Sequence, residues 1–285
     1  MVAGNKPDWD LLIVKAIESL GDDTFFETLC AAFQRVIPLD KGNLIMAYQR
    51  HNRPSILAHS LTGKDLKLHV DNYLAGLYLL DPFYQAAVEG LPSGFYRLDD
   101  FVPDNFYESE FYLRYYRAGN IKDDLGYCFA LDDVGRQGDH IHFSFACTRD
   151  EVLREEQLDD LREMEPVIRA LVLKHLRLTD NAALPRPDSG LHRQLMQVMN
   201  DFGSSILTNR ERQVLQLILH GHSSQSIAGK LEIALRTVKL HRQNLYQKLD
   251  ISSQAELFYL FIDSLSCLEG SDNFDPLSSY LRPPG

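Results

Sequence analysis

The sequence predicts a chain of two parts, an α+β domain in which helices flank an antiparallel sheet and then an all-α domain of four helices. In the first part, strand-like alternation at 125–131 and 140–147 lies between helical patterns. In the second part, 207–266, apolar residues recur at helical spacing between capping and turn residues. With 285 residues, of which 45% are hydrophobic, the chain is long enough to form two cores.

The first third of the chain alternates between helical and strand patterns. Apolar spacing from Asp8 to about Val36 predicts two helices that are broken near Gly21, and Asp22 or Asp23 begins the second. Strands are expected next, joined by a hairpin loop, and then helices on either side of an aromatic-rich stretch. The expected strands are 43–48 and 55–61, and the expected helices are 64–80, ending before Asp81-Pro82, and about 107–118.

Two later strands have one large face and one small face. In 125–131 the large side chains alternate with Gly126, Cys128 and Ala130, and in 140–147 the apolar side chains oppose His140, His142 and Ser144. A turn at 135–138 would join them as antiparallel neighbours. The small face leaves room either for a ligand or for a closely packed helix, and the nearby aromatic residues favour a pocket.

A long helix and a linker end the first part. Apolar spacing predicts a helix from Glu151 to about Leu178, which Pro166 kinks or splits. Pro, Asp and Gly then mark a linker at 179–190, and 191–202 is expected to form a short helix. The predicted division is therefore a sensor-like domain at 1–178, a linker at 179–206, a helical domain at 207–266 and a flexible tail at 267–285.

The helical domain opens with a capping box. Thr208 and Glu211 are spaced to satisfy backbone donors of the first turn, which predicts a helix from Asn209 to about His220, closed by Gly221. Ser223 or Ser224 caps a second, short helix. A short connection leads to a third helix, with Val238, His241 or Leu245, and Leu249 on its inner face. A short helix, a tight turn and a cationic helix have helix-turn-helix geometry.

The runs LTNRERQVLQLILHG and SIAGKLEIALRTVKLHRQNLYQKL resemble the C-terminal DNA-binding domain of the LuxR, or NarL-type, family of bacterial regulators. The resemblance places Lys239, Leu240 and Gln243 opposite base edges, and it assigns Thr237, His241 and Arg242 to phosphates or to the helix scaffold. Arg236 also lies on the outer face of this third helix. Two positions depart from the family: Glu232 stands where a turn glycine is common, and Ala234 where a capping Ser or Thr is common. Each departure costs on the order of 1 kcal/mol if Glu232 adopts a positive φ and the third helix lacks a side-chain cap.

Charge is distributed unevenly along the chain. The net charge is −11, but 207–250 holds seven Lys or Arg against three Asp or Glu, so this segment carries +4 and the remainder −15. An acidic body repels DNA phosphates, and the cationic segment attracts them. Scattered cysteines without a CxxC pair exclude a zinc ribbon and a disulfide scaffold, and no run is apolar enough to span or target a membrane. These features indicate a cytoplasmic protein.

A homodimer is expected because two DNA-binding domains together recognise a site of two-fold symmetry. Ser253 and Glu256 form a second capping box that begins a fourth helix. In the family this helix contributes to dimerisation, and Phe261 with Leu265 would do so here. The alternative is that these side chains only fill the core of their own domain.

The ligand candidates lie around Asp81-Pro82. An aspartate before proline resembles the family's autoinducer-binding domain, where it holds the ligand amide and aromatic residues line the pocket. The alternative is that Asp81 is a turn residue that ends a helix. The only tryptophan, Trp9, lies far from the positions where that domain has its tryptophans, which argues against an acyl-homoserine lactone. The candidate ligand-binding residues are Tyr73, Asp81, Phe95, Tyr96 and Cys128.

The expected function is that of a transcriptional regulator. A small molecule in the sensor-like domain, as in quorum-sensing regulators, would control how a homodimer binds promoter DNA, with RNA polymerase as a further partner. The alternative is a ligand-independent regulator whose first domain serves dimerisation or docking of a partner protein. The sequence has neither a GxSxG elbow nor a glycine-rich phosphate loop, and His140 and His142 lack a third metal ligand. We therefore expect no enzymatic activity, no cofactor and no metal.

Overall fold

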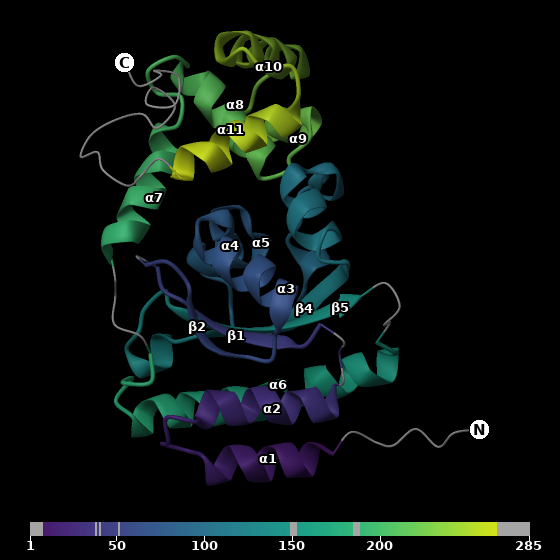
Figure 1. The fold of residues 1–285 in the computed structure, drawn as a ribbon, viewed down its shortest axis with the longest axis vertical. Coiled ribbons are helices and arrows are strands. Elements are labelled where there is room, and N and C mark those ends of the chain that lie inside the picture. The colour runs from purple at the N-terminus through teal and green to yellow at the C-terminus, as the bar shows by residue number, and fades with distance from the viewer. Residues whose placement is uncertain are drawn as a thin grey trace.

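The computed structural model describes residues 8–37, 39, 41–50, 52–148, 153–184 and 189–266. Figure 1 shows a layered molecule: helices α1, α2 and α6 lie below a central sheet, shorter helices lie above it, and the C-terminal helices form the uppermost layer. Residues 8–178 are called the body below, and α8 to α11 are called the head. In the described part of the chain, no helix combines the length and the apolar character needed to cross a bilayer.

The central sheet is antiparallel throughout, in the order β2-β1-β5-β4-β3. The four predicted strands and the β4–β5 turn are present, but β2 ends two residues earlier than predicted and β4 begins at Ile121, four residues earlier. Gly126 pairs with Ser144, and Cys128 pairs with His142. The edge strand β3 was missed because its four residues are too few to show a period. The strands are β1 Asn43–Tyr48, β2 Ser55–His59, β3 Gly94–Arg97, β4 Ile121–Ala130 and β5 His140–Thr148.

The lower face of the sheet is covered by α2 and α6, and α1 packs below α2 (Figure 1). The predicted break at Gly21 is confirmed, with a φ of +89°, but the second helix begins at Phe25 after Thr24 instead of at Asp22 or Asp23. Pro166 does not split the long helix, which runs unbroken from Glu155; its predicted start at Glu151 lies outside the described residues. The three helices are α1 Trp9–Glu18, α2 Phe25–Val36 and α6 Glu155–Leu178.

Short helical segments cover the upper face. The continuous helix predicted for 64–80 is wrong, because the segment changes helical type and turns at Gly76, whose φ is +141°. The helix predicted near 107–118 is a short 3-10 turn followed by a π-helix. The α-helices are α3 Gly63–Leu66, α4 Asn72–Leu74 and α5 Pro82–Val88. The π-helices are Lys67–Asp71 and Tyr112–Arg117, and the 3-10 turns of the body are Leu77–Leu80, Leu98–Asp100, Phe106–Glu108 and Asp132–Val134.

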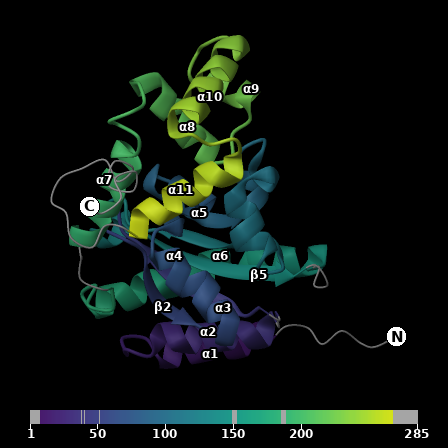
Figure 2. The same cartoon turned by 45° about the horizontal axis from the view of Figure 1, so that its top comes forward.

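The C-terminal helices pack onto the upper, aromatic face of the body. Buried residues of the head and of α7 belong to the same hydrophobic cluster as Tyr78, Phe106 and Phe111 of the body. Figure 2 shows α10 at the end of the molecule farthest from α1. The helices are α7 Ser189–Asp201, α8 Asn209–Leu219, α9 Ser224–Lys230, α10 Leu235–Leu249 and α11 Gln254–Ser266. The predicted tail, 267–285, lies outside the described residues.

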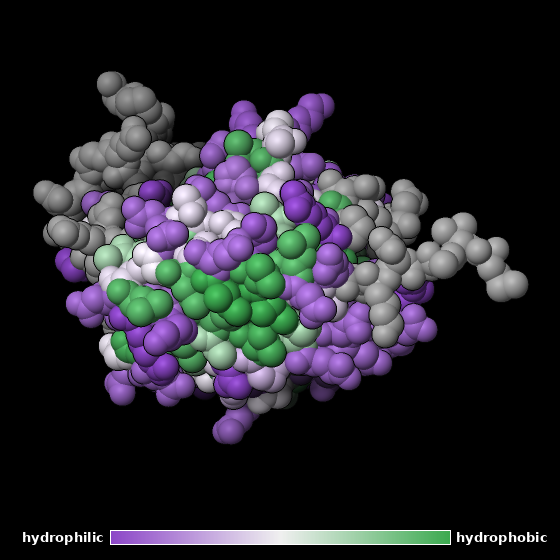
Figure 3. All heavy atoms as spheres, turned by 90° about the horizontal axis from the view of Figure 1, so that it is seen from below, coloured by the Kyte–Doolittle hydropathy of each residue, from purple (hydrophilic) through white to green (hydrophobic). Residues whose placement is uncertain are grey.

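The outer side of α1 is apolar. Leu11, Val14 and Ile17, spaced three residues apart, are 37%, 48% and 54% exposed. Figure 3 shows the face seen from below, where hydrophobic side chains gather into one continuous patch. Leu12 and Ala16, on the opposite side of the same helix, are buried against the body.

Candidate functional site

The head begins with the predicted capping box. The Thr208 hydroxyl accepts a hydrogen bond from the Glu211 backbone N–H at 3.4 Å, and the Glu211 carboxylate accepts one from the Thr208 N–H at 2.8 Å. The carboxylate also accepts a hydrogen bond from Lys248 Nζ of α10 at 2.7 Å. One buried glutamate therefore both starts α8 and fixes the end of α10 against it.

The turn between α9 and α10 is tight and strained. Ser223 caps α9 by accepting a hydrogen bond from the Ser226 N–H at 3.1 Å. Glu232 has a φ of +54°, and Ala234 makes no side-chain cap at the start of α10. The positive φ at Glu232 and the missing side-chain cap at Ala234 are the two consequences expected from the sequence. Each destabilises the domain by on the order of 1 kcal/mol.

The outer face of α10 is polar, cationic and open. Arg236, Lys239, Leu240 and Gln243 are exposed, and Leu240 is 54% exposed although it is apolar. The inner residues Val238, Leu245 and Leu249 are buried, as predicted. The exposed side chains thus stand on a helix whose orientation is fixed by packing on its other side, which is the arrangement needed for entry into a DNA major groove.

Three other candidate DNA-contacting residues are held closer to the scaffold. Arg242 donates a hydrogen bond from Nη1 to the Ser224 hydroxyl of α9 at 2.9 Å, and its guanidinium lies 5.9 Å from the centre of the Tyr246 ring. Thr237 and His241 are partly buried. These positions fit the scaffold or phosphate roles that the sequence suggested for them better than contacts to base edges.

A buried cluster of tyrosines surrounds Asp81. Tyr73 donates a hydrogen bond to Asp81 Oδ2 at 2.5 Å, and Tyr48 donates one to the same oxygen at 3.3 Å while also bonding His142 Nδ1 at 2.8 Å. Asp81 Oδ1 accepts from the Phe83 N–H at 3.0 Å and so caps α5. Asp81 therefore both ends the 3-10 turn Leu77–Leu80, in line with the helix-ending alternative, and begins α5.

The predicted ligand residues do not line one cavity. Tyr73, Asp81 and Cys128 lie in the upper core, but Phe95 packs against Tyr127 in the core below the sheet. Tyr96 donates its hydroxyl hydrogen to the Pro92 carbonyl near the surface. Phe95 faces away because successive residues of a strand point to opposite faces, so two adjacent aromatic residues on β3 cannot line the same pocket.

Aromatic rings fill most of the space above the small face of β4. Tyr48, Tyr73, Tyr78 and Phe83 are each at most 1% exposed and pack against neighbouring aromatic rings in edge-on, tilted or stacked contacts. Beside Asp124 and Ser144 a cavity of about 20 Å³ remains. That volume suits about one water molecule rather than an effector.

Two buried carboxyl groups give the body a distinct pH dependence. Burial raises the pKa of Asp81 to about 6 and that of Asp124 to about 7, although hydrogen bonds from Tyr73 and from Ser144, respectively, act in the opposite direction. Burial lowers the pKa of His142 to about 3. A carboxyl with a raised pKa destabilises the fold as pH rises, whereas a histidine with a lowered pKa destabilises it as pH falls.

We expect Asp124→Asn to flatten the loss of stability above neutral pH. The folded state binds the Asp124 proton more tightly than the unfolded state does, so its contribution is complete below about pH 4 and is lost as pH rises through about 7. Asparagine keeps an oxygen that can accept the Ser144 hydrogen bond but does not ionise. Urea unfolding at pH 5 and pH 8 should show a smaller decrease in the variant, and equal decreases in both proteins would contradict the assignment.

The predicted dimerisation residues lie differently from expectation. Phe261 is 0% exposed and packs edge-on against Phe202, with ring centroids 5.5 Å apart, so it belongs to the interior of the protomer. Its burial favours the alternative that Phe261 fills the interior of its own protomer over a role in dimerisation. The side chain of Leu265 lies outside the described residues. At the start of α11, the Ser253 hydroxyl accepts a hydrogen bond from the Glu256 N–H, as predicted. The Glu256 carboxylate accepts one from the Ser252 N–H instead of from the Ser253 N–H, so only half of the predicted capping box forms.

His140 and His142 contact protein groups. His140 Nε2 bonds the Leu91 carbonyl at 2.8 Å, and His142 stacks on Phe83 with ring centroids 4.4 Å apart. Among the described residues, no group of three His, Cys, Asp or Glu side chains could hold a metal ion.

The sequence did not predict the contacts between the body and the head. Asn105 donates its N–H to the Gly221 carbonyl at 3.1 Å, and the Asp104 carboxylate accepts hydrogen bonds from the N–H, at 2.9 Å, and hydroxyl of Ser223. Arg114 lies 4.0 Å from the centre of the Tyr259 ring. No sequence pattern signals these contacts, because the partners are more than one hundred residues apart.

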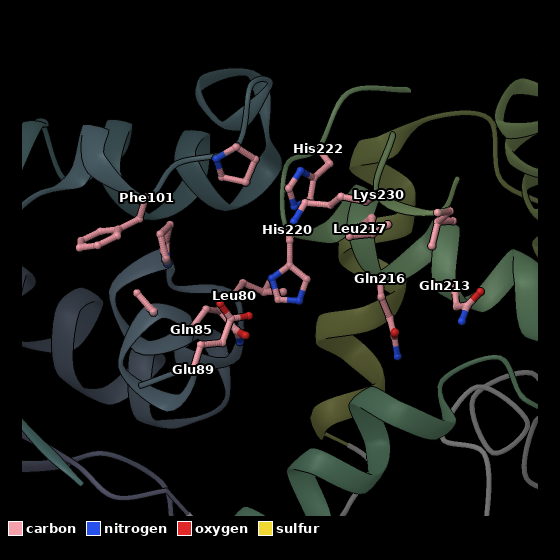
Figure 4. A pocket seen from close by; sticks show the side chains of 14 residues that line it. Leu80, Gln85, Glu89, Phe101, Gln213, Gln216, Leu217, His220, His222 and Lys230 are labelled. Carbon is pink, nitrogen blue, oxygen red and sulfur yellow. The ribbon is translucent and has the colours of Figure 1, made fainter. Parts of the chain in front are cut away.

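A cleft of about 490 Å³ lies beside these contacts, between α5 of the body and α8 of the head. Figure 4 shows Gln85 and Glu89 on the side of the body, and His222 with Lys230 on the side of the head. Burial lowers the pKa of His220 to about 4, and the charges of the neighbouring His222 and Lys230 act in the same direction. Burial and the charge of Lys230 likewise lower the pKa of His222 to about 4.

Comparisons with known proteins match both parts of the chain. The family model of the bacterial regulatory proteins, luxR family, matches residues 205–261. An HTH-type transcriptional regulator from the exeN 3′ region of Aeromonas salmonicida is 33% identical over 189 residues, covering 65% of this chain and 94% of that protein. The HTH-type transcriptional regulator MalT of Klebsiella pneumoniae is 35% identical over 103 residues, which cover 35% of this chain but only 11% of MalT.

Two solved structures are similar to this one. The VqsR LBD domain from Pseudomonas aeruginosa has a TM-score of 0.49 and 25% identity, covering 60% of this chain and 97% of that one. SdiA from Escherichia coli has a TM-score of 0.42 and 16% identity, covering 91% of this chain and 98% of that one.

Proposed function

The chain belongs to the luxR family of bacterial regulatory proteins, and we propose that its head reads promoter DNA with the outer face of α10 while its body controls that binding. As a member of this family it is a DNA-binding transcriptional regulator and not an enzyme. The observation that carries the proposal is the open cationic face of α10, fixed from behind by α8 and α9.

We assign separate roles to the side chains of α10. Lys239, Leu240 and Gln243 face base edges, since they are exposed at the centre of the outer face. Arg236 contacts phosphates. Arg242 sets the angle between α9 and α10 through its hydrogen bond to Ser224. The charge separation along the chain supports this assignment, since the acidic body is repelled by the duplex that the head approaches.

The proposed division of the chain follows the helices. A sensor-like domain spans 1–178, a linker with α7 spans 179–206, and the DNA-binding domain spans 207–266. A homodimer is part of the proposal, because helix-turn-helix proteins read two-fold symmetric sites as dimers. A small-molecule effector that changes the relation between body and head is also part of it.

A second candidate function is a regulator without a ligand, whose body only dimerises or docks a partner protein. The filled aromatic core around Asp81 favours it, because the space in which the sequence suggested a ligand is occupied by tyrosine side chains. The two candidates differ in whether DNA binding responds to any small molecule.

The DNA-binding proposal is tested on the full chain with a duplex selected from a random library. Lys239→Ala and Gln243→Ala should each weaken specific binding by about 1 to 3 kcal/mol for every base that the original side chain contacts, measured by fluorescence anisotropy at fixed salt. Lys174→Ala, an exposed lysine of α6 on the other side of the sheet, is the matched control and should change binding little. A weakening of less than a few tenths of a kcal/mol at both positions would remove them from the bases.

A further inference from the structure

We propose that the cleft between α5 and α8 binds a small amphipathic carboxylate, with its carboxylate at Lys230 and His222 and its apolar part against the body. This inference rests on the proposed function and places its effector between the body and the head, not at Asp81. The volume of about 490 Å³ lies within the range of about 300 to 1,000 Å³ that is typical of sites for small ligands, and such sites favour domain interfaces.

The walls of the cleft supply an apolar surface from both sides. Leu80, Pro82 and Phe101 line it from the body, and Leu217 and Leu231 line it from the head. Gln85 donates a hydrogen bond to the Leu79 carbonyl at 2.7 Å and is therefore held in place. A ligand with an apolar portion would bury that portion between two preformed surfaces, which limits the conformational entropy lost on binding.

The polar groups of the cleft favour an anion. Lys230 is exposed, lines the cleft and makes no ion pair with any described residue, and His222 lies close enough to it for their charges to repel. His220 lies between the side chains of the body and these two residues (Figure 4). Glu89 is the one acidic residue among those lining the cleft, and it stands on the wall of the body, away from Lys230 in this view.

Protonation of the two histidines should be linked to binding. Charged groups that face them are Lys230, which opposes protonation of both, and Asp104, which favours protonation of His222. At pH 7 both rings are neutral, and a carboxylate placed beside them favours their charged forms. Affinity should therefore rise as pH falls below about 6 toward the unliganded pKa of about 4, by up to about tenfold per pH unit for each proton taken up.

A ligand in this cleft would couple to the head directly. It would contact both parts of the chain, and so it binds the docked arrangement, in which Asn105 meets Gly221, better than a separated one. Such differential affinity is the requirement for a ligand to shift a conformational equilibrium.

The test is isothermal titration calorimetry of the full chain with decanoate, decanol and decyltrimethylammonium below their micelle concentrations. Decanoate should bind at one site per chain, at least about tenfold more tightly than the other two amphiphiles. Lys230→Gln should remove most of that preference, and Lys174→Gln should retain it. Ala86→Phe, which fills the cleft from α5, should abolish binding while leaving the unfolding midpoint close to that of the original protein.

Equal binding of the three amphiphiles, unchanged binding by Lys230→Gln, or no binding of decanoate to the original protein would each overturn the proposal. Duplex binding is measured on the same preparations to separate the two claims. A chain that binds selected DNA but not decanoate overturns the cleft site alone. A chain that binds decanoate but no DNA overturns the proposed function and leaves the cleft as a binding site.

Discussion

Gly126→Ala should destabilise the body by more than about 3 kcal/mol, at or above the upper end of the usual cost of overpacking. A Cβ built on Gly126 would lie 1.6 Å from the Phe143 carbonyl oxygen and 2.8 Å from its carbonyl carbon. Both atoms belong to the backbone of β5, which pairs with β4 on one side and β1 on the other. The strand cannot move away without breaking a second ladder, so no side-chain rotation relieves the clash.

Gly229→Ala is the matched control. This glycine lies in α9, has a negative φ, and has no heavy atom within 4 Å of a built Cβ. Alanine in a helix is favoured over glycine by up to about 1 kcal/mol, so this substitution should stabilise the protein slightly. Urea unfolding monitored by circular dichroism compares the two variants. A Gly126→Ala protein with the midpoint of the original would show that β4 and β5 are not held as described.

Phe261→Ala should lower the free energy of unfolding by about 3 to 5 kcal/mol, the usual cost of removing a buried aromatic side chain. The ring is fully buried and packs edge-on against Phe202 at the end of α7. Both belong to the cluster that joins the head to the upper face of the body. Truncation leaves a cavity where α7, α8 and α11 meet, and their packing cannot close it without moving the helices.

Leu240→Ala provides the comparison for Phe261. Leu240 lies in the same head but is 54% exposed, so its truncation should change stability by no more than about 0.5 kcal/mol. Denaturant unfolding and sedimentation of the two variants distinguish a core role from a dimer seam. If Phe261→Ala shifted the protein from dimer to monomer with little loss of monomer stability, the residue would belong to an interface between copies instead.

The sequence alone was sufficient to predict the first three helices of the head, α8 to α10. The capping box of Thr208 and Glu211, the terminating Gly221 and the capping Ser223 act within a few residues of themselves, so their spacing predicted the helix boundaries. The small and large faces of β4 and β5 were predictable for the same reason, since strand alternation is a property of neighbouring residues.

What the sequence could not decide depends on which distant segments meet. The environment of Asp81 was set by Tyr48, Tyr73 and His142, which come from three other elements and fill the space where a ligand was expected. The sequence left Phe261 as a candidate for dimerisation, whereas in the structure Phe202, at the end of α7, packs against its ring. The cleft between α5 and α8 exists only because the head docks on the body through Asp104 and Asn105. Local spacing determines where helices and strands begin and which face is apolar, whereas burial, pKa values and cavities arise from long-range packing that no short pattern encodes.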